Sequence, residues 1–93
     1  MKTITVQIGN SDDKLSQKEW SEFHLRISGA CIAYAAETHF SGTSNGEASW
    51  QNACFIFDCE DSDIEELRME LSFIRSCFGQ ESIALMEGET EFI

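Results

Sequence analysis

Two histidines and four cysteines are the side chains of this chain that are best suited to chemistry, and their spacing supports little of it. His24 lies beside the apolar stripe of an expected helix, and His39 lies in an expected strand. No motif places a serine or a cysteine beside either histidine, so no nucleophile–base pair is expected. We therefore predict ordinary surface or edge histidines and a protein without catalytic residues.

The cysteines contain no CxxC pair. Cys54 and Cys59 are five residues apart in an expected strand, and an odd separation directs them to opposite faces. This arrangement argues against a shared zinc site and against a local disulfide. The N-terminal residues alternate in polarity and do not resemble a signal peptide. We expect four reduced thiols, most of them in the core of a cytoplasmic protein that holds no metal and no cofactor.

The densest acidic cluster comprises Asp58, Glu60, Asp61 and Asp63. As a calcium loop that starts at Asp58, it lacks the central glycine, and Met69 replaces the terminal glutamate. The simpler interpretation is that these acids complement the dipole of the following helix. Weak magnesium binding by the carboxylates is the alternative.

The elements that position these residues can be read from periodicity and turn residues. In chain order we expect a strand over 3–8, a helix from residue 16 to about residues 33–36, a short strand over 37–40, a flexible connection over 41–46, a strand over 50–59, a second helix up to residue 78, and a final strand over 82–86 and 90–93 with a bend at residue 88.

Both helices begin with the signature of a capping box, Ser16 with Glu19 and Ser62 with Glu65. Helical spacing predicts one buried face on each helix. On the first helix that face consists of Trp20, Phe23, Ile27 and Ala30 or Cys31. On the second it consists of Ile64, Leu67, Leu71, Ile74 and Phe78, with Gly79 ending the helix.

The resulting order, β-α-β-β-α-β, predicts a single α+β domain over residues 1–93 with a ferredoxin-like fold. Two helices would cover one face of a four-stranded antiparallel sheet. The main alternative is a three-stranded α+β domain in which residues 37–40 form a loop.

Charge is distributed unevenly along the chain, which carries a formal net charge of −11. Residues 1–36 hold four acids and four bases, whereas residues 37–93 hold thirteen acids and only Arg68 and Arg75. Such a field repels phosphate and attracts basic surfaces, so direct nucleic-acid binding is not expected. No run of eighteen apolar residues is present, so no membrane-spanning helix is expected.

The second helix carries an apolar set that its core does not require. Met69, Phe73 and Cys77 step by four on the side opposite the core stripe, with acids beside them at 65, 66 and 70. An apolar centre with an acidic rim is typical of protein interfaces. Leu25 and Ile32 form a weaker counterpart on the first helix. Scattered surface apolar residues are the alternative interpretation.

The strand over 50–59 is apolar on both faces. Cys54 and Ile56 point one way, and Ala53, Phe55 and Phe57 point the other. A two-layer domain leaves one sheet face open, and RNA-recognition domains stack bases on such a face. The acidity argues against RNA here. Burial against a partner protein or a second copy of the chain fits better.

Three segments, ITVQIGNSDDKLSQKEW, WQNACFIFDCE and EGETEFI, resemble small proteins of bacteria and their phages. That resemblance implies no activity. In size, acidity and fold type the chain is also similar to phage anti-defence proteins, including anti-CRISPR inhibitors. This similarity implies a single acidic domain that occludes a nucleic-acid site on its target, and it assigns no role to any residue.

The leading hypothesis is a small acidic inhibitor, encoded by a phage or another mobile element, that binds a basic nucleic-acid-binding surface of a host protein. The expected partner-binding residues are Glu65, Glu66, Met69, Glu70 and Phe73. The expected acidic patch comprises Asp58, Glu60, Asp61, Asp63, Glu87, Glu89 and Glu91. The alternative hypothesis is a homodimeric ligand-binding or regulatory domain without catalysis.

Overall fold

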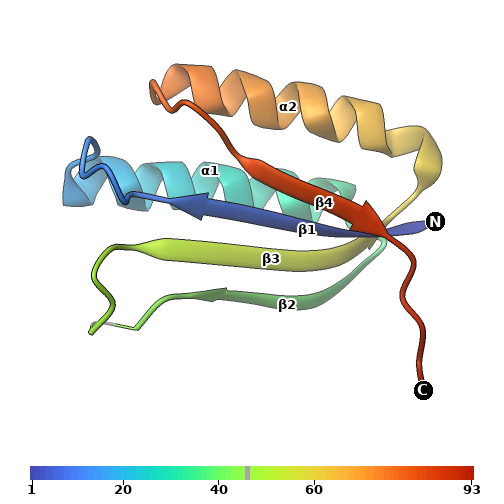
Figure 1. The fold of residues 1–93 in the computed structure, drawn as a ribbon. Helices are drawn as coiled ribbons and strands as arrows, with labels where there is room; N and C mark the ends of the chain where they lie inside the picture. The colour runs from blue at the N-terminus through green and yellow to red at the C-terminus, as the bar shows by residue number, and fades with distance from the viewer. Residues whose placement is uncertain (46) are drawn as a thin grey trace.

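A four-stranded antiparallel sheet and two α-helices make up the computed structural model, which describes residues 1–45 and 47–93 (Figure 1). Along the chain the elements are β1 (Lys2–Gly9), α1 (Gln17–Tyr34), β2 (Glu37–Thr43), β3 (Asn52–Cys59), the 3₁₀ turn η1 (Asp61–Asp63), α2 (Ile64–Cys77) and β4 (Ala84–Gly88). The strand order is β2-β3-β1-β4, so β1 and β3 are central and β2 and β4 are the edges.

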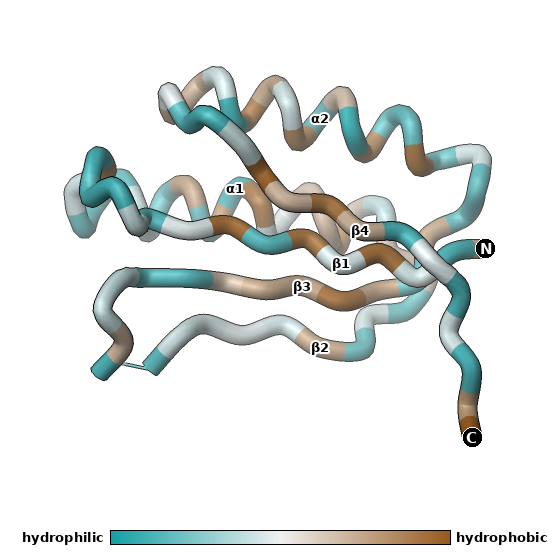
Figure 2. Tube along the Cα trace, viewed as in Figure 1, coloured by the Kyte–Doolittle hydropathy of each residue, from teal (hydrophilic) through white to brown (hydrophobic). Residues whose placement is uncertain are grey.

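The core lies between the two helices and one face of the sheet. Polarity alternates along β1, as Figure 2 shows, and its buried residues Ile4, Val6 and Ile8 pair with Phe57, Phe55 and Ala53 of β3. The helices cover this face of the sheet with buried side chains. From α1 these are Trp20, Phe23, Ile27, Ala30 and Cys31, and from α2 they are Leu67, Leu71 and Ile74. Both predicted apolar stripes are thereby confirmed, with Ile64 and Phe78 partly buried at the ends of α2. The thickness of 17 Å corresponds to one sheet and one helix layer.

The start of α1 follows its sequence signal. The Ser16 side chain accepts a hydrogen bond from the Glu19 backbone N–H at 3.2 Å, and the Glu19 carboxylate accepts one from the Ser16 N–H at 3.0 Å. These reciprocal bonds satisfy backbone donors that the first turn of a helix leaves unpaired. The first predicted capping box is confirmed.

The start of α2 differs from the prediction of a capping box at Ser62. The residue that precedes the helix is Asp63, and no side chain caps it. The Asp63 N–H donates to the Glu60 carbonyl at 2.9 Å, which closes the 3₁₀ turn and places Ser62 inside that turn. The predicted end of α2 agrees with the structure, because Gly79 follows the C-cap residue Phe78 and has a φ of +64°.

Two strand predictions need correction. Residues 41–43 belong to β2 and not to the flexible connection, since Ser41, Gly42 and Thr43 pair with β3. The remainder of that predicted connection includes residue 46, which lies outside the described residues. Residues 90–93 form no strand. Gly88 already pairs with Thr3, one residue from the start of β1, so the chain beyond has almost no strand left to pair with.

Candidate protein-binding surfaces

The outer face of α2 presents two large apolar side chains to solvent. Met69 is 66% exposed and Phe73 is 60% exposed. They stand one helical turn apart, on the side opposite the buried Leu67 and Leu71, as a rotation of 100° per residue requires. Their predicted position off the core is confirmed.

Acidic side chains lie beside these two residues, and Arg68, Ser72 and Ser76 line the adjoining surface. Glu65, Glu66 and Glu70 are all exposed, and within residues 1–45 and 47–93 none of them forms an ion pair. Their field reaches the neighbouring helix. The pKa of Tyr34 on α1 is raised above its ordinary value by partial burial, and then by the carboxylates of Glu66 and Glu70. The five predicted partner-binding residues therefore lie together on the solvent-exposed side of α2. We call the surface formed by Glu65, Glu66, Met69, Glu70 and Phe73 the α2 face.

A groove between the helices extends the α2 face toward α1. Its volume is about 500 Å³, and Leu25 of α1 and Glu70 of α2 both line it. Leu25 is 72% exposed, and Ile32 is 65% exposed farther along α1. The weaker apolar counterpart expected on α1 is thus exposed, and Leu25 adjoins the α2 face.

The predicted acidic patch does not form one surface of free carboxylates. The Glu87 carboxylate lies 3.1 Å from the Arg68 guanidinium, which links β4 to α2. Glu89 lies 3.4 Å from Lys2, and Asp61 lies 3.2 Å from the amino group of Met1. The other members are Glu60 and Glu91, both exposed, Asp63 at the start of α2, and Asp58, which belongs to the sheet. Ion pairs between residues far apart in the sequence therefore engage some of the predicted acids and leave others free within the described part of the chain. Counting charges along the chain does not reveal these pairs.

Asp58 is held in a polar cluster on β3. His39 Nε2 lies 3.0 Å from Asp58 Oδ2, and Thr3 Oγ1 donates to Asp58 Oδ1 at 3.0 Å. These two bonds keep the pKa of Asp58 below its ordinary value. The carboxylate stands between the hydroxyl and the imidazole, whereas a catalytic triad places the imidazole next to the nucleophile. These contacts therefore connect β1, β2 and β3, and they do not place a base where it could activate a hydroxyl.

His24 is not an ordinary surface histidine. Its ring is half-buried, with its centroid 5.6 Å from the ring of Phe55 and 6.3 Å from that of Trp20. Helical spacing places it beside the core stripe, and the tertiary structure adds the contact with β3.

The sheet face away from the helices, which we call the open face, carries apolar residues from three strands. Phe40 pairs with Ile56, Ile56 with Thr5, and Thr5 with Met86, so these four side chains form one row across the sheet. Phe40 is 52% exposed and Met86 is 58% exposed. Sequence reasoning found Ile56 and missed Phe40 and Met86, because the register between separate strands decides which residues share this row.

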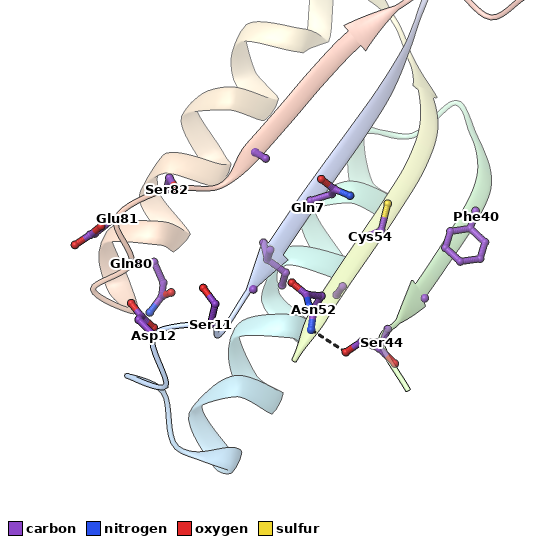
Figure 3. A pocket seen from close by; sticks show the side chains of 16 residues that line it. Gln7, Ser11, Asp12, Phe40, Ser44, Asn52, Cys54, Gln80, Glu81 and Ser82 are labelled. Atoms are coloured by element: carbon purple, nitrogen blue, oxygen red, sulfur yellow. Dashed lines mark hydrogen bonds between the residues drawn. The ribbon is translucent and has the colours of Figure 1, made fainter. Parts of the chain in front are cut away.

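A hollow of about 630 Å³ lies at the end of the open face where β1 runs into α1 (Figure 3). Phe40 stands on one side, with its ring so close to Gly42 that a Cβ there would come within 2.7 Å of it. The polar residues of the lining are Gln7, Ser11, Asp12, Thr43, Ser44, Asn52, Gln80, Glu81 and Ser82. Asp12 and Glu81 both pair with Lys14, at 3.6 and 3.5 Å. The hollow therefore exposes amide and hydroxyl groups, and its two acidic side chains are already paired with Lys14.

All four cysteines are free thiols. Cys31 and Cys59 are buried, Cys54 is half-buried on the open face, and Cys77 is exposed. The expectation that most of them lie in the core was therefore wrong, since only two do. Burial raises the pKa of Cys31 to about 12.

In the part of the chain that the structure describes, no three histidine, cysteine, aspartate or glutamate side chains gather closely enough to bind a metal ion. Neither described helix combines the length and the apolar character needed to cross a membrane.

No protein-family model matches the chain, and a search of the curated proteins finds no match either.

Proposed function

We propose that this protein is a non-catalytic acidic binding domain that attaches to a basic surface of another protein through its α2 face. The observation that carries the proposal is the exposure of Met69 and Phe73 among three carboxylates that form no ion pair in the described structure. A water-exposed apolar pair gains free energy when a partner covers it. The unpaired acids beside that apolar pair favour a partner rich in lysine and arginine.

The two components contribute differently to binding. The carboxylates raise the association rate, because a protein with a net charge of −11 draws a basic surface toward it from a distance. The apolar pair slows dissociation once water has been excluded around it. Leu25, across the groove from Glu70, widens the apolar contact.

The proposal extends to the kind of partner. Surfaces that bind nucleic acid are basic, so an acidic domain that covers one would act as an inhibitor. The most specific form of the hypothesis is a cytoplasmic, phage-encoded inhibitor of the anti-CRISPR type. Its support is the acid excess, together with the four free thiols, which suit a reducing compartment.

We also propose that the fold is of the ferredoxin-like, split βαβ type. The support is the element order along the chain together with the strand order β2-β3-β1-β4. Each helix connects two strands that have a third strand between them. On this basis the helix layer and the open face are separate surfaces, free to bind different partners.

Affinity capture from a bacterial lysate tests the function. The bait is the whole chain, compared with a Met69→Ser/Phe73→Ser variant and a Glu66→Lys/Glu70→Lys variant. We expect the apolar variant to bind the captured protein about 30-fold more weakly, equivalent to roughly 2 kcal/mol. The charge variant should mainly slow association and flatten its salt dependence. Added DNA or RNA should compete with the bait for the captured protein.

The matched control is Met86→Ser, because Met86 is exposed to a similar extent on the opposite face of the molecule. It should leave capture unchanged. If the α2 variants retain every captured protein at wild-type strength, the α2 face does not bind a partner. If nucleic acid fails to compete, the inhibitor form of the proposal is lost, while binding through the α2 face is retained.

A further inference from the structure

The centre of the open face carries no charge, although the chain contains 17 acidic residues. Two adjacent rows cross all four strands in register. The first consists of Phe40, Ile56, Thr5 and Met86, and the second consists of Gly42, Cys54, Gln7 and Ala84. We propose that this face binds a second copy of the chain, sheet against sheet. This inference goes beyond the proposed function, which uses the helix layer.

The charge distribution favours that occupant. A basic partner is attracted where carboxylates lie, and the two rows contain none. Two copies of a chain with a net charge of −11 repel each other wherever their acids meet. The centre of the open face is where two copies can touch without bringing unpaired carboxylates together.

Several acids at the ends of the open face are engaged by neighbouring side chains, whereas Glu37, which pairs with Asp58 between β2 and β3, forms no ion pair within residues 1–45 and 47–93. At one end, Asp58 is hydrogen-bonded to His39 at 3.0 Å. At the other end, Asp12 and Glu81 flank the hollow, and both pair with Lys14. In Figure 3 Asp12 and Glu81 lie at the lower left, apart from Gln7 and Cys54 on the central strands. The positive charge of Lys14 therefore reduces the repulsion that a second acidic chain would meet at the end of the face near the hollow.

The contacts available on this face are apolar at both edges of the sheet. Phe40 on β2 and Met86 on β4 are each more than half exposed, and Ile56 lies between them. Covering such groups is favourable for each copy, and a two-fold symmetric contact uses every one of them twice.

The size of the face indicates a weak dimer. Four strands spaced about 4.8 Å apart, with five to eight residues each rising about 3.3 Å, give a rectangle of roughly 300–500 Å² in projection. Standard interfaces bury about 800 Å² per partner. We therefore expect a dimer that dissociates on dilution.

Sedimentation velocity over a concentration series up to about 1 mM tests the proposal. The wild-type chain should shift from monomer to dimer as its concentration rises. Phe40→Ser and Met86→Ser, made separately on opposite edges of the sheet, should each raise the dimer dissociation constant about tenfold or more. The matched control is Met69→Ser on the α2 face, which should leave the dissociation constant unchanged. Circular dichroism checks that each variant is folded.

A second measurement does not depend on any variant. Amide chemical shifts of the wild-type chain should change with concentration at the strand residues of the two rows and not on α2. A chain that stays monomeric throughout the series overturns the proposal, as does a dimer that Met69→Ser breaks and Phe40→Ser does not. Because the α2 variants report on the partner and the sheet variants report on the dimer, the two proposals can fail separately.

Discussion

His39 Nε2 lies 3.0 Å from Asp58 Oδ2, joining edge strand β2 to β3 at the point where the pairing of the two strands shifts. The shift falls between Thr38 and Phe40, with His39 as the extra residue of a β-bulge. Without the bulge, His39 would pair with Ile56, and the Phe40 side chain would face the helix layer. The bulge therefore places Phe40 on the open face and directs His39 toward a carboxylate.

Hydrogen bonds from His39 and Thr3 lower the pKa of Asp58 in the folded state. Asp58 therefore stabilises the fold only while it is ionised. That contribution is complete above the ordinary carboxyl pKa of about 3.9 and is lost as pH falls through the lower pKa of the folded state. Asp58→Asn should therefore be less stable than wild type at neutral pH, and the difference should shrink below about pH 4. Urea melts across this pH range measure it. In a His39→Ala background the effect of Asp58→Asn should be smaller.

The core stripe of α2 can be tested by two substitutions two residues apart. Leu67 is fully buried, and Leu67→Ala should lower the free energy of unfolding by about 2–5 kcal/mol, because it removes core contacts and leaves a cavity. Met69→Ala on the exposed side should cost less than about 1 kcal/mol. Chemical denaturation of both variants gives the comparison. Equal losses would mean that the helix is oriented differently.

The two serines with capping signatures should behave differently. Ser16→Ala removes a cap whose two hydrogen bonds are present, and it should cost about 0.5–2 kcal/mol. Ser62→Ala removes a hydroxyl that does not cap α2, and it should stay within about 0.5 kcal/mol of wild type. Thermal or urea melts of the pair decide the point. A large loss in Ser62→Ala would restore the capping box that the sequence predicts there.

Thiol reactivity should follow burial. Cys77 is exposed and should react with iodoacetamide first, while Cys54 should follow more slowly. Cys31 should resist labelling until the protein unfolds, because burial blocks access and raises its pKa to about 12. Mass spectrometry of the labelled chain with and without denaturant measures the order. Early modification of Cys31 would contradict the packing of α1.

The isolated protein should bind neither single-stranded nor double-stranded nucleic acid at physiological salt. Beyond residue 36 only Arg68 and Arg75 are basic, and Arg68 already pairs with Glu87. Phosphate contacts need free cations, so the electrostatic term that underlies such binding has the wrong sign here. Fluorescence anisotropy with labelled RNA and DNA measures it. Micromolar affinity for RNA would favour base stacking on the open face instead of a second copy.

Local periodicity was enough to predict much of the architecture. The alternation in β1 and the spacing of Leu67, Leu71 and Ile74 predicted both layers of the core. The same helical spacing predicted that Met69 and Phe73 would be exposed. These features depend on residues within one or two turns of each other, so a single stretch of sequence contains the whole signal.

The tertiary structure alone decided which residues meet across the sheet and between its layers. The row from Phe40 to Met86 depends on three strand registers and one bulge. The pair of Arg68 and Glu87, 19 residues apart, takes one acid out of the predicted patch. Each of these outcomes is set by packing between distant segments, where a shift of one residue moves every side chain of a strand to the other face. No local pattern in the sequence carries that information.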